Sequence, residues 1–251
     1  MSIAIRSALV YRLADRVVTS GETVRAIVVR AGIPAERVVA IPPGVDTARF
    51  HAAVSGTTVR DELRLDAGEP LVGLVANIRG SKGHNVFLEA ARDVLRAAPR
   101  ARFLIVGDGV GYDDVRRRVS DLGLARHVTM TGFRRDIPEV MAALDVLVLP
   151  SIRSEAASQV IPQALAVGTP VVATTVGGSP ELVRDGATGR LVPPDDARAL
   201  ARAVLEILRD PERARAMGRA GQVAVHAHFT LDGSMARTTA VYRELLASAA
   251  D

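Results

Sequence analysis

The stretch LVGLVANIRGSKGHNVFLEAARDVLRA, residues 71–97, contains the pattern that decides the fold. It opens with a short run that is apolar and rich in valine and leucine, as expected for a strand buried on both faces. After a turn, residues 85–97 repeat apolar side chains at helical spacing. A buried strand followed directly by an amphipathic helix is the repeating unit of a parallel sheet covered by helices.

The same alternation of strands and helices continues as far as residue 194. Beyond it the pattern is helical only, with an acidic start at residue 195 and a proline that follows the first helix. We therefore predict an α/β fold: one parallel sheet with helices on both faces, followed by C-terminal helices. Strands are predicted at 71–77, 102–107, 127–132, 145–150, 170–175 and 189–193, and the late helices near 195–210, 211–226 and 231–248.

The first 50 residues have a different pattern. Two short β-branched runs, DRVVTS (15–20) and RVVAIPP (37–43), enclose the helical pattern ETVRAIVVRAG (22–32). The segment 51–70 is polar and irregular, and we interpret it as a connector into the main domain. We place the domain boundary between residues 47 and 48.

Composition restricts the class of protein. The chain is 48% hydrophobic but 3% aromatic, so valine, leucine, isoleucine and alanine must build the core. Cysteine is absent, which excludes disulfides and thiolate metal sites. Arginine and acidic residues are interleaved at a net charge of +4, without the basic, aromatic run of a nucleic-acid surface. No secretory signal is recognisable, and we expect a cytoplasmic chain, with peripheral contact to a membrane face left open.

Ligands of an open parallel sheet bind beyond the carboxyl ends of its strands, so the loops that follow strands are informative. The loop after residues 71–77 contains Arg79, Lys82 and Gly83. Lys82 is the sole lysine of the chain, and every other basic residue is an arginine or a histidine. Two cations and a glycine ahead of a helix suit a phosphate group, because the helix N-terminus adds oriented N–H groups. An ammonium is compact enough to lie between two phosphates, whereas a guanidinium is a broad fork.

A second glycine-rich loop, GDGVGY (107–112), contains Gly107, Asp108 and Gly109 after the next strand. It resembles the dinucleotide fingerprint, but its last spacing is one residue short and the acid expected about 20 residues later is missing. We interpret it as a tight turn that lets the backbone approach a ligand.

A third constellation is EAASQVIPQALAVGTPVVATTVGGSPELV, residues 155–183. Glu155 lies in a loop of small residues, Ala156, Ala157 and Ser158, and Gln163 follows in the next helix. If most of this segment is helical, the two polar side chains are roughly 12 Å apart, at opposite ends of an extended ligand. Gly177 and Gly178 then provide another turn at which a ligand can approach the backbone.

Taken in order, ADRVVTSGETVR, PPGVDTARF, SKGH, VGDG, TGFRRDIPEVMAALDVLVLPS and the run from Glu155 to Asp196 resemble the family 4 glycosyltransferases. The resemblance covers nearly the whole chain. It implies a retaining enzyme of GT-B architecture, in which two Rossmann-like domains face each other. Residues 48–251 would be the C-terminal domain, which binds a nucleotide-sugar donor, and residues 1–47 the tail of the N-terminal acceptor domain.

The resemblance also implies roles for individual residues. Lys82 corresponds to the lysine that holds the donor diphosphate, and Glu155 to the first glutamate of a Glu-x7-Glu motif, which contacts the donor sugar. Phe133 and Arg134 correspond to a loop near the nucleobase. A fixed cation at the diphosphate would stabilise the charge that develops on the leaving group. The chain contains no Asp-x-Asp, and we expect a metal-independent mechanism without a cofactor.

Two positions depart from the family pattern. Asn77 stands where the family has an arginine five residues before the lysine, and Arg79 can replace that arginine from the same loop. Gln163 stands in place of the second glutamate, which contacts the ribose, and its amide can hydrogen-bond a hydroxyl without carrying charge.

The resemblance leaves most of the acceptor domain unaccounted for, so we expect the chain alone to be inactive, with an unidentified glycosyl acceptor. A non-catalytic nucleotide-binding or interaction module derived from a glycosyltransferase is the alternative, and a sugar-nucleotide epimerase of similar architecture is a third reading. Because the strands of residues 1–47 and the last helix would lack their usual cover, we also expect a homo-oligomer through these segments.

Overall fold

The computed structural model describes residues 13–153 and 155–248, and all structural statements concern these residues. Its centre is a six-stranded sheet in the order β5-β4-β3-β6-β7-β8, with all neighbours parallel. The predicted parallel sheet is confirmed, and each strand lies inside its predicted stretch. The strands are β3 (Leu71–Val75), β4 (Arg102–Val106), β5 (Val128–Gly132), β6 (Val146–Leu149), β7 (Val171–Thr174) and β8 (Gly189–Val192).

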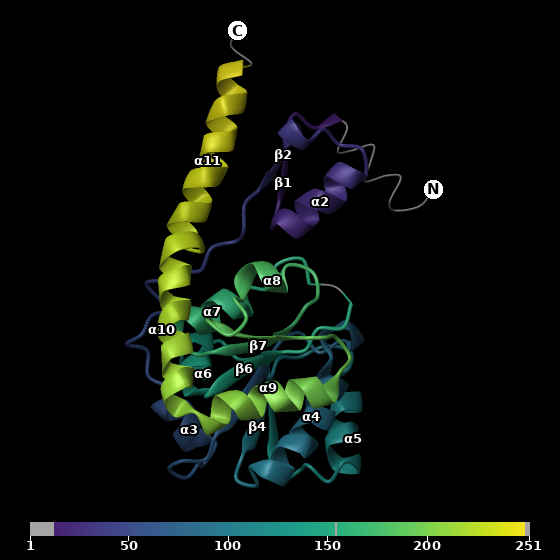
Figure 1. Cartoon of the computed structure of the whole chain (residues 1–251), viewed down its shortest axis with the longest axis vertical. Helices are drawn as coiled ribbons and strands as arrows, with labels where there is room; N and C mark the ends of the chain where they lie inside the picture. The colour runs from purple at the N-terminus through teal and green to yellow at the C-terminus, as the bar shows by residue number, and fades with distance from the viewer. Residues whose placement is uncertain (1–12, 154, 249–251) are drawn as a thin grey trace.

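Helices cover both faces of this sheet, as predicted (Figure 1). Successive residues of β3 show why: Val72 and Leu74 belong to one apolar core, Leu71 and Val75 to the other. The first core includes α4 (His84–Ala97), α5 (Tyr112–Asp121) and α9 (Ala197–Arg209), and the second includes α3 (Thr57–Glu62), α6 (Ile137–Ala143), α7 (Val160–Val167) and α8 (Ser179–Leu182).

The strand order reverses beside β3. From β3 the chain proceeds to β4 and β5 on one side and then returns to β6, β7 and β8 on the other. The loops that follow β3 and β6 therefore lead to helices on opposite faces of the sheet, α4 and α7, and ligands of open parallel sheets bind at such a reversal of strand order. The candidate residues of the sequence lie on the loops that follow β3, β4, β5 and β6, except Gln163, which is on α7.

The segment 51–70 is more ordered than predicted, because it contains α3. This short helix packs against α6 through Val59, which is fully buried. Arg60 of α3 donates hydrogen bonds to the carbonyls of Ala143 (2.7 Å) and Glu69 (2.5 Å). This helix was not predicted, because six residues with one buried side chain leave no periodic pattern to detect.

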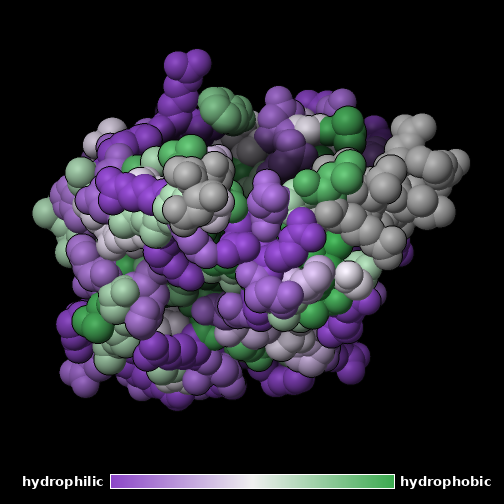
Figure 2. All heavy atoms as spheres, turned by 90° about the horizontal axis from the view of Figure 1, so that it is seen from above, coloured by the Kyte–Doolittle hydropathy of each residue, from purple (hydrophilic) through white to green (hydrophobic). Residues whose placement is uncertain are grey.

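Residues 13–40 form a small separate lobe that lies above the main sheet in Figure 1. The two predicted strands and the helix between them are confirmed as β1 (Val17–Thr19), α2 (Glu22–Arg30) and β2 (Val38–Ala40). β1 and β2 pair in parallel with each other, and no third described strand joins them. Seen from above, the surface is largely hydrophilic, with hydrophobic side chains in small separate patches (Figure 2).

Two long helices close the chain and link the lobes. α10 (Pro211–His228) contacts α7 and α9, and α11 (Leu231–Ser248) continues upward beside the small lobe (Figure 1). Arg237 of α11 donates to the carbonyl of Ala40 (2.6 Å), and Glu244 pairs with Arg16. No described residue of α11 is fully buried, so its apolar side is only partly covered, as predicted.

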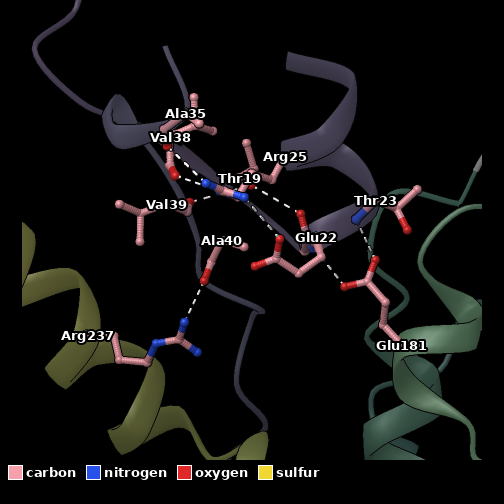
Figure 3. Close-up of polar contacts among 11 residues, drawn as sticks. Thr19, Glu22, Thr23, Arg25, Ala35, Val38, Val39, Ala40, Glu181 and Arg237 are labelled. Atoms are coloured by element: carbon pink, nitrogen blue, oxygen red, sulfur yellow. Dashed lines mark hydrogen bonds and ion pairs between the residues drawn. The ribbon is translucent and has the colours of Figure 1, made fainter. Parts of the chain in front are cut away.

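The small lobe also touches the main domain through one carboxylate (Figure 3). Glu181 of α8 accepts hydrogen bonds from the backbone N–H groups of Glu22 and Thr23, both at 2.7 Å. These N–H groups lie in the first turn of α2 and have no acceptor within the helix, and α2 has no side-chain cap of its own. Gly21 permits this contact, because a Cβ atom there would lie 2.8 Å from the Glu181 carboxylate.

Candidate functional site

A cavity of about 1040 Å³ lies beyond the carboxyl ends of β3 and β4 and beside the loop after β5. Its floor includes apolar side chains at the ends of these two strands, Val75 and Val106. The structure brings six of the predicted substrate-binding residues to its wall: Asn77, Gly107, Asp108, Gly109, Phe133 and Arg134.

The glycines of the second loop let it lie against the loop after β3. Gly107 has a φ of 135°, and a Cβ atom there would lie 1.9 Å from the carbonyl oxygen of Ala76. Gly109 has a φ of 150°, and its Cβ would meet the carbonyl of Ile78 at 2.5 Å. Asp108 accepts a hydrogen bond from the Gly109 N–H at 2.7 Å. The tight turn is therefore confirmed, and the close approach is between two backbone segments.

Two residues after β5 form the outer wall of the cavity. Phe133 is 72% exposed and offers a free aromatic face. Arg134 is instead held by Glu62 of α3 (2.7 and 2.8 Å) and by Asp136 (2.6 and 2.9 Å). The hydrogen bonds that Arg134 donates, first to Glu62 and then to Asp136, raise the pKa of Arg134, and the same bonds lower the pKa of each carboxyl. Arg134 thus supports the wall and keeps its charge paired.

Lys82 and Glu155, predicted separately, lie in direct contact. The Lys82 Nζ donates to Glu155 Oε2 at 2.5 Å, and the two side chains are 14% and 5% exposed. Ser151 donates from its Oγ to the same oxygen at 2.7 Å. Sequence reasoning missed Ser151, because a lone serine after a strand has no distinguishing pattern. The cluster joins the loop after β3 to the loop after β6, across the reversal of strand order.

Three glycines allow the loops after β3, β6 and β7 to pack against one another. Gly83 has a φ of 71°, and a Cβ atom at this position would lie 1.9 Å from the carbonyl oxygen of Pro150. Gly177 has a φ of 58°, and its Cβ would lie 1.9 Å from the Glu155 carbonyl oxygen, to which the Gly178 N–H donates at 2.7 Å. We expected a ligand to approach the backbone at Gly177 and Gly178. The structure shows the backbone of Glu155 there instead.

The segment from Glu155 to Gln163 is less helical than expected. α7 begins at Val160, so Ala156, Ala157 and Ser158 precede the helix. The reason is tertiary: the Glu155 carbonyl accepts from Gly178, and this turn replaces the local hydrogen bonds of a helix. Gln163 is on α7, half-buried, and its amide has no side-chain partner among the described residues.

The remaining cation, Arg79, is exposed at the start of the short 3-10 turn Gly80–Lys82. Its side chain has no partner in the described part of the chain, and its carbonyl accepts from the Lys82 N–H at 3.0 Å. The N-terminus of α4 follows directly, so Arg79, Lys82 and the free N–H groups of a 14-residue helix share one turn.

His84 is the first residue of α4 and lies beneath this turn. Its side chain is buried, and neither ring nitrogen has a hydrogen-bond partner within the described residues. Burial, and secondarily the charge of Lys82, lower the pKa of His84 to about 4. The ring is therefore neutral near pH 7 and adds no positive charge beside Lys82.

Across residues 13–153 and 155–248, no three His, Cys, Asp or Glu side chains gather in a geometry that suits a metal ion. None of the helices in these residues has the length and apolar character of a membrane span.

Comparison with known proteins agrees with this geometry. The family model for glycosyl transferases group 1 matches residues 56–223. The chain is 36% identical over 217 residues to a D-inositol 3-phosphate glycosyltransferase of Segniliparus rotundus, covering 84% of this chain and 48% of the relative. It is 37% identical over 207 residues to the GDP-mannose-dependent alpha-(1-6)-phosphatidylinositol monomannoside mannosyltransferase of Mycolicibacterium smegmatis, covering 79% and 53%. The chain thus spans about half the length of these relatives.

Solved structures of the same architecture are also similar. The Anabaena protein Alr3699/HepE, crystallised with UDP, superimposes with a TM-score of 0.87 at 26% identity, covering 94% of this chain and 65% of that one. The sucrose-phosphate synthase of Thermosynechococcus elongatus gives a TM-score of 0.86 at 30% identity, covering 98% and 62%. With its six-stranded parallel sheet and a family match over most of its length, this chain belongs to the group 1 glycosyl transferases.

Proposed function

We propose that this chain binds a nucleotide-diphospho-sugar and forms the donor-binding half of a retaining, metal-independent glycosyltransferase. The contact between Lys82 and Glu155 at the reversal of strand order carries the proposal. It places a cation for phosphates and a carboxylate for sugar hydroxyls within one hydrogen-bonded cluster. The complexes of Alr3699/HepE with UDP and with UDP-glucose support a ligand of this class.

In this proposal each part of the site binds one part of the donor. The exposed ring of Phe133 stacks on the nucleobase over the cavity. The ammonium of Lys82, the guanidinium of Arg79 and the N-terminus of α4 bind the diphosphate, and Gln163 binds a ribose hydroxyl. Glu155 accepts hydrogen bonds from the sugar. Because the diphosphate gains charge as it leaves, the fixed cations stabilise the transition state more than the bound donor.

The test is a calorimetric titration of the purified chain with UDP, GDP and ADP, and with one sugar ester of each. We expect one base to bind best, the diphosphate to bind more tightly than the matching monophosphate, and the sugar to add affinity. Nucleosides without phosphates are the control for base binding alone. Absence of binding by all six ligands at millimolar concentration would contradict the proposal.

We also propose that the chain self-associates through residues 1–47 and α11. In support, Val18 and Ile27 of the small lobe and Met235 and Tyr242 of α11 expose apolar side chains. Sedimentation velocity at micromolar concentration should show a dimer or larger species, and Met235→Glu combined with Tyr242→Glu should shift it toward the monomer. A monomer at all concentrations of the unaltered chain would refute self-association and leave the donor site unaffected.

A further inference from the structure

Ser151 occupies a position that the donor-binding role does not by itself explain. It follows β6, its side chain is completely buried, and its Oγ donates to Glu155 Oε2 at 2.7 Å. Its own carbonyl accepts a hydrogen bond from the hydroxyl of Thr174, at the end of β7, at 2.6 Å. Ser151 is thus anchored by the ends of two neighbouring strands and directed at one oxygen of the carboxylate.

The two oxygens of Glu155 have different surroundings. Oε2 accepts from both Lys82 and Ser151. No described residue donates to Oε1. A fully buried oxygen without a donor would be an unsatisfied buried atom, and Oε1 is not one of these, so solvent reaches it. The carboxylate therefore has one fixed oxygen and one free oxygen, although the residue as a whole is 6% exposed.

Binding of a diphosphate creates a competition for Lys82. An ammonium has three donors, and a diphosphate attracts it more strongly than one carboxylate does. When Lys82 turns toward phosphate, Glu155 loses part of its charge pairing, and a buried carboxylate without partners is costly. Ser151 is then the remaining described side chain that donates to Oε2.

We propose that Ser151 is a positioning residue for donor binding, and this inference rests on the proposed function. Ser151 holds Oε2 of Glu155 while Lys82 binds the diphosphate, so that Oε1 stays aimed at the sugar hydroxyls. Thr174 supports this orientation by holding the Ser151 backbone.

The test compares two ligands in Ser151→Ala. We expect the dissociation constant of the nucleotide-sugar to rise about tenfold or more, as for a lost hydrogen bond to a charged group. The dissociation constant of the matching nucleoside diphosphate should change less than about twofold, because its contacts do not use Glu155. Ser151→Thr, which keeps a hydroxyl, should recover sugar affinity, and Ser120→Ala on the exposed face of α5 is the matched control.

A second measurement separates positioning from collapse of the site. Since Lys82 is the sole lysine, protein labelled with ¹³C and ¹⁵N on lysine gives one side-chain signal by NMR. In ligand-free Ser151→Ala this signal should stay at its parental position, because the Lys82–Glu155 pair persists, whereas Glu155→Gln should move it. The nucleoside diphosphate should move it in the parent and in Ser151→Ala alike.

The outcomes distinguish the two proposals. Suppose that the parent binds both ligands. If Ser151→Ala then weakens both equally, or weakens neither of them, the positioning role is overturned and donor binding stands. A Lys82 signal shifted to that of an exposed lysine in ligand-free Ser151→Ala also overturns it, because the serine is then a structural support. If the parent binds neither ligand, the proposed function itself fails and takes the role of Ser151 with it.

Discussion

Lys82→Ala is expected to lower the free energy of unfolding by about 3 kcal/mol or more and to remove measurable binding of nucleoside diphosphates. Both losses follow from one contact. Removing the lysine leaves Glu155 buried without its cationic partner, and breaking such a pair typically costs about 3–5 kcal/mol. It also removes a cation from the proposed phosphate site. Denaturant unfolding measures the first effect and calorimetry the second.

Arg79→Ala is the matched control, because Arg79 is an exposed cation of the same turn and its side chain has no partner among the described residues. We expect it to weaken diphosphate binding by about 1.5–3 kcal/mol and to leave stability unchanged. Adding Glu155→Gln to Lys82→Ala should restore much of the stability without restoring binding. Unchanged diphosphate affinity in both single variants would refute the phosphate site. Unchanged stability in Lys82→Ala would show that the buried pair does not stabilise the domain.

Gly177→Ala is expected to destabilise the domain by several kcal/mol and to eliminate the extra affinity that a sugar gives to a nucleotide. A side chain at a φ of 58° costs about 1–2 kcal/mol by itself. The added Cβ would also lie 1.9 Å from the Glu155 carbonyl oxygen, a distance that no backbone tolerates. Glu155 must then move, and with it the carboxylate. Thermal unfolding and titration with a nucleotide and its sugar ester measure the two effects.

Gly186→Ala separates the two causes. Gly186 also has a positive φ, 75°, but nothing lies within 4 Å of a Cβ atom at this position. We expect it to lose only the conformational contribution, about 1–2 kcal/mol, and to bind both ligands like the parent. Equal destabilisation by the two substitutions would show that the turn at Gly177 can move away from Glu155, and would contradict the packing described above.

The positions of the strands could be predicted because each buried strand is an uninterrupted apolar run between polar turns. β3, β4, β6 and β7 are fully or almost fully buried, and their residue ranges follow from this pattern alone. The short helix α3 was missed, since one buried residue, Val59, produces no period. Residues 155–159 precede α7, and no local pattern near Glu155 specifies the hydrogen bond that its carbonyl accepts from Gly178.

For the candidate site, too, the sequence predicted the residues but not the contacts between them. Residue type and loop position singled out Lys82 and Glu155, and the family resemblance added Phe133 and Arg134. Six of the predicted residues line the cavity. Their relation to one another was not predictable. Lys82 and Glu155 are 73 residues apart. Their contact requires the loops after two neighbouring strands to meet, which they do where Gly83 packs against the carbonyl of Pro150.

The sequence by itself determined which segments become strands and helices, which loops carry polar residues, and which family pattern those loops follow. These properties depend on local periodicity and residue type, which are read along the chain. The tertiary structure alone decided that Arg134 is paired with Glu62, that Glu181 caps the first turn of α2, and that Ser151 holds Glu155. Each of these contacts is a distance of about 3 Å between side chains or backbone groups brought together by packing. Such a distance depends on the geometry of the whole sheet and its loops, and no local pattern specifies it.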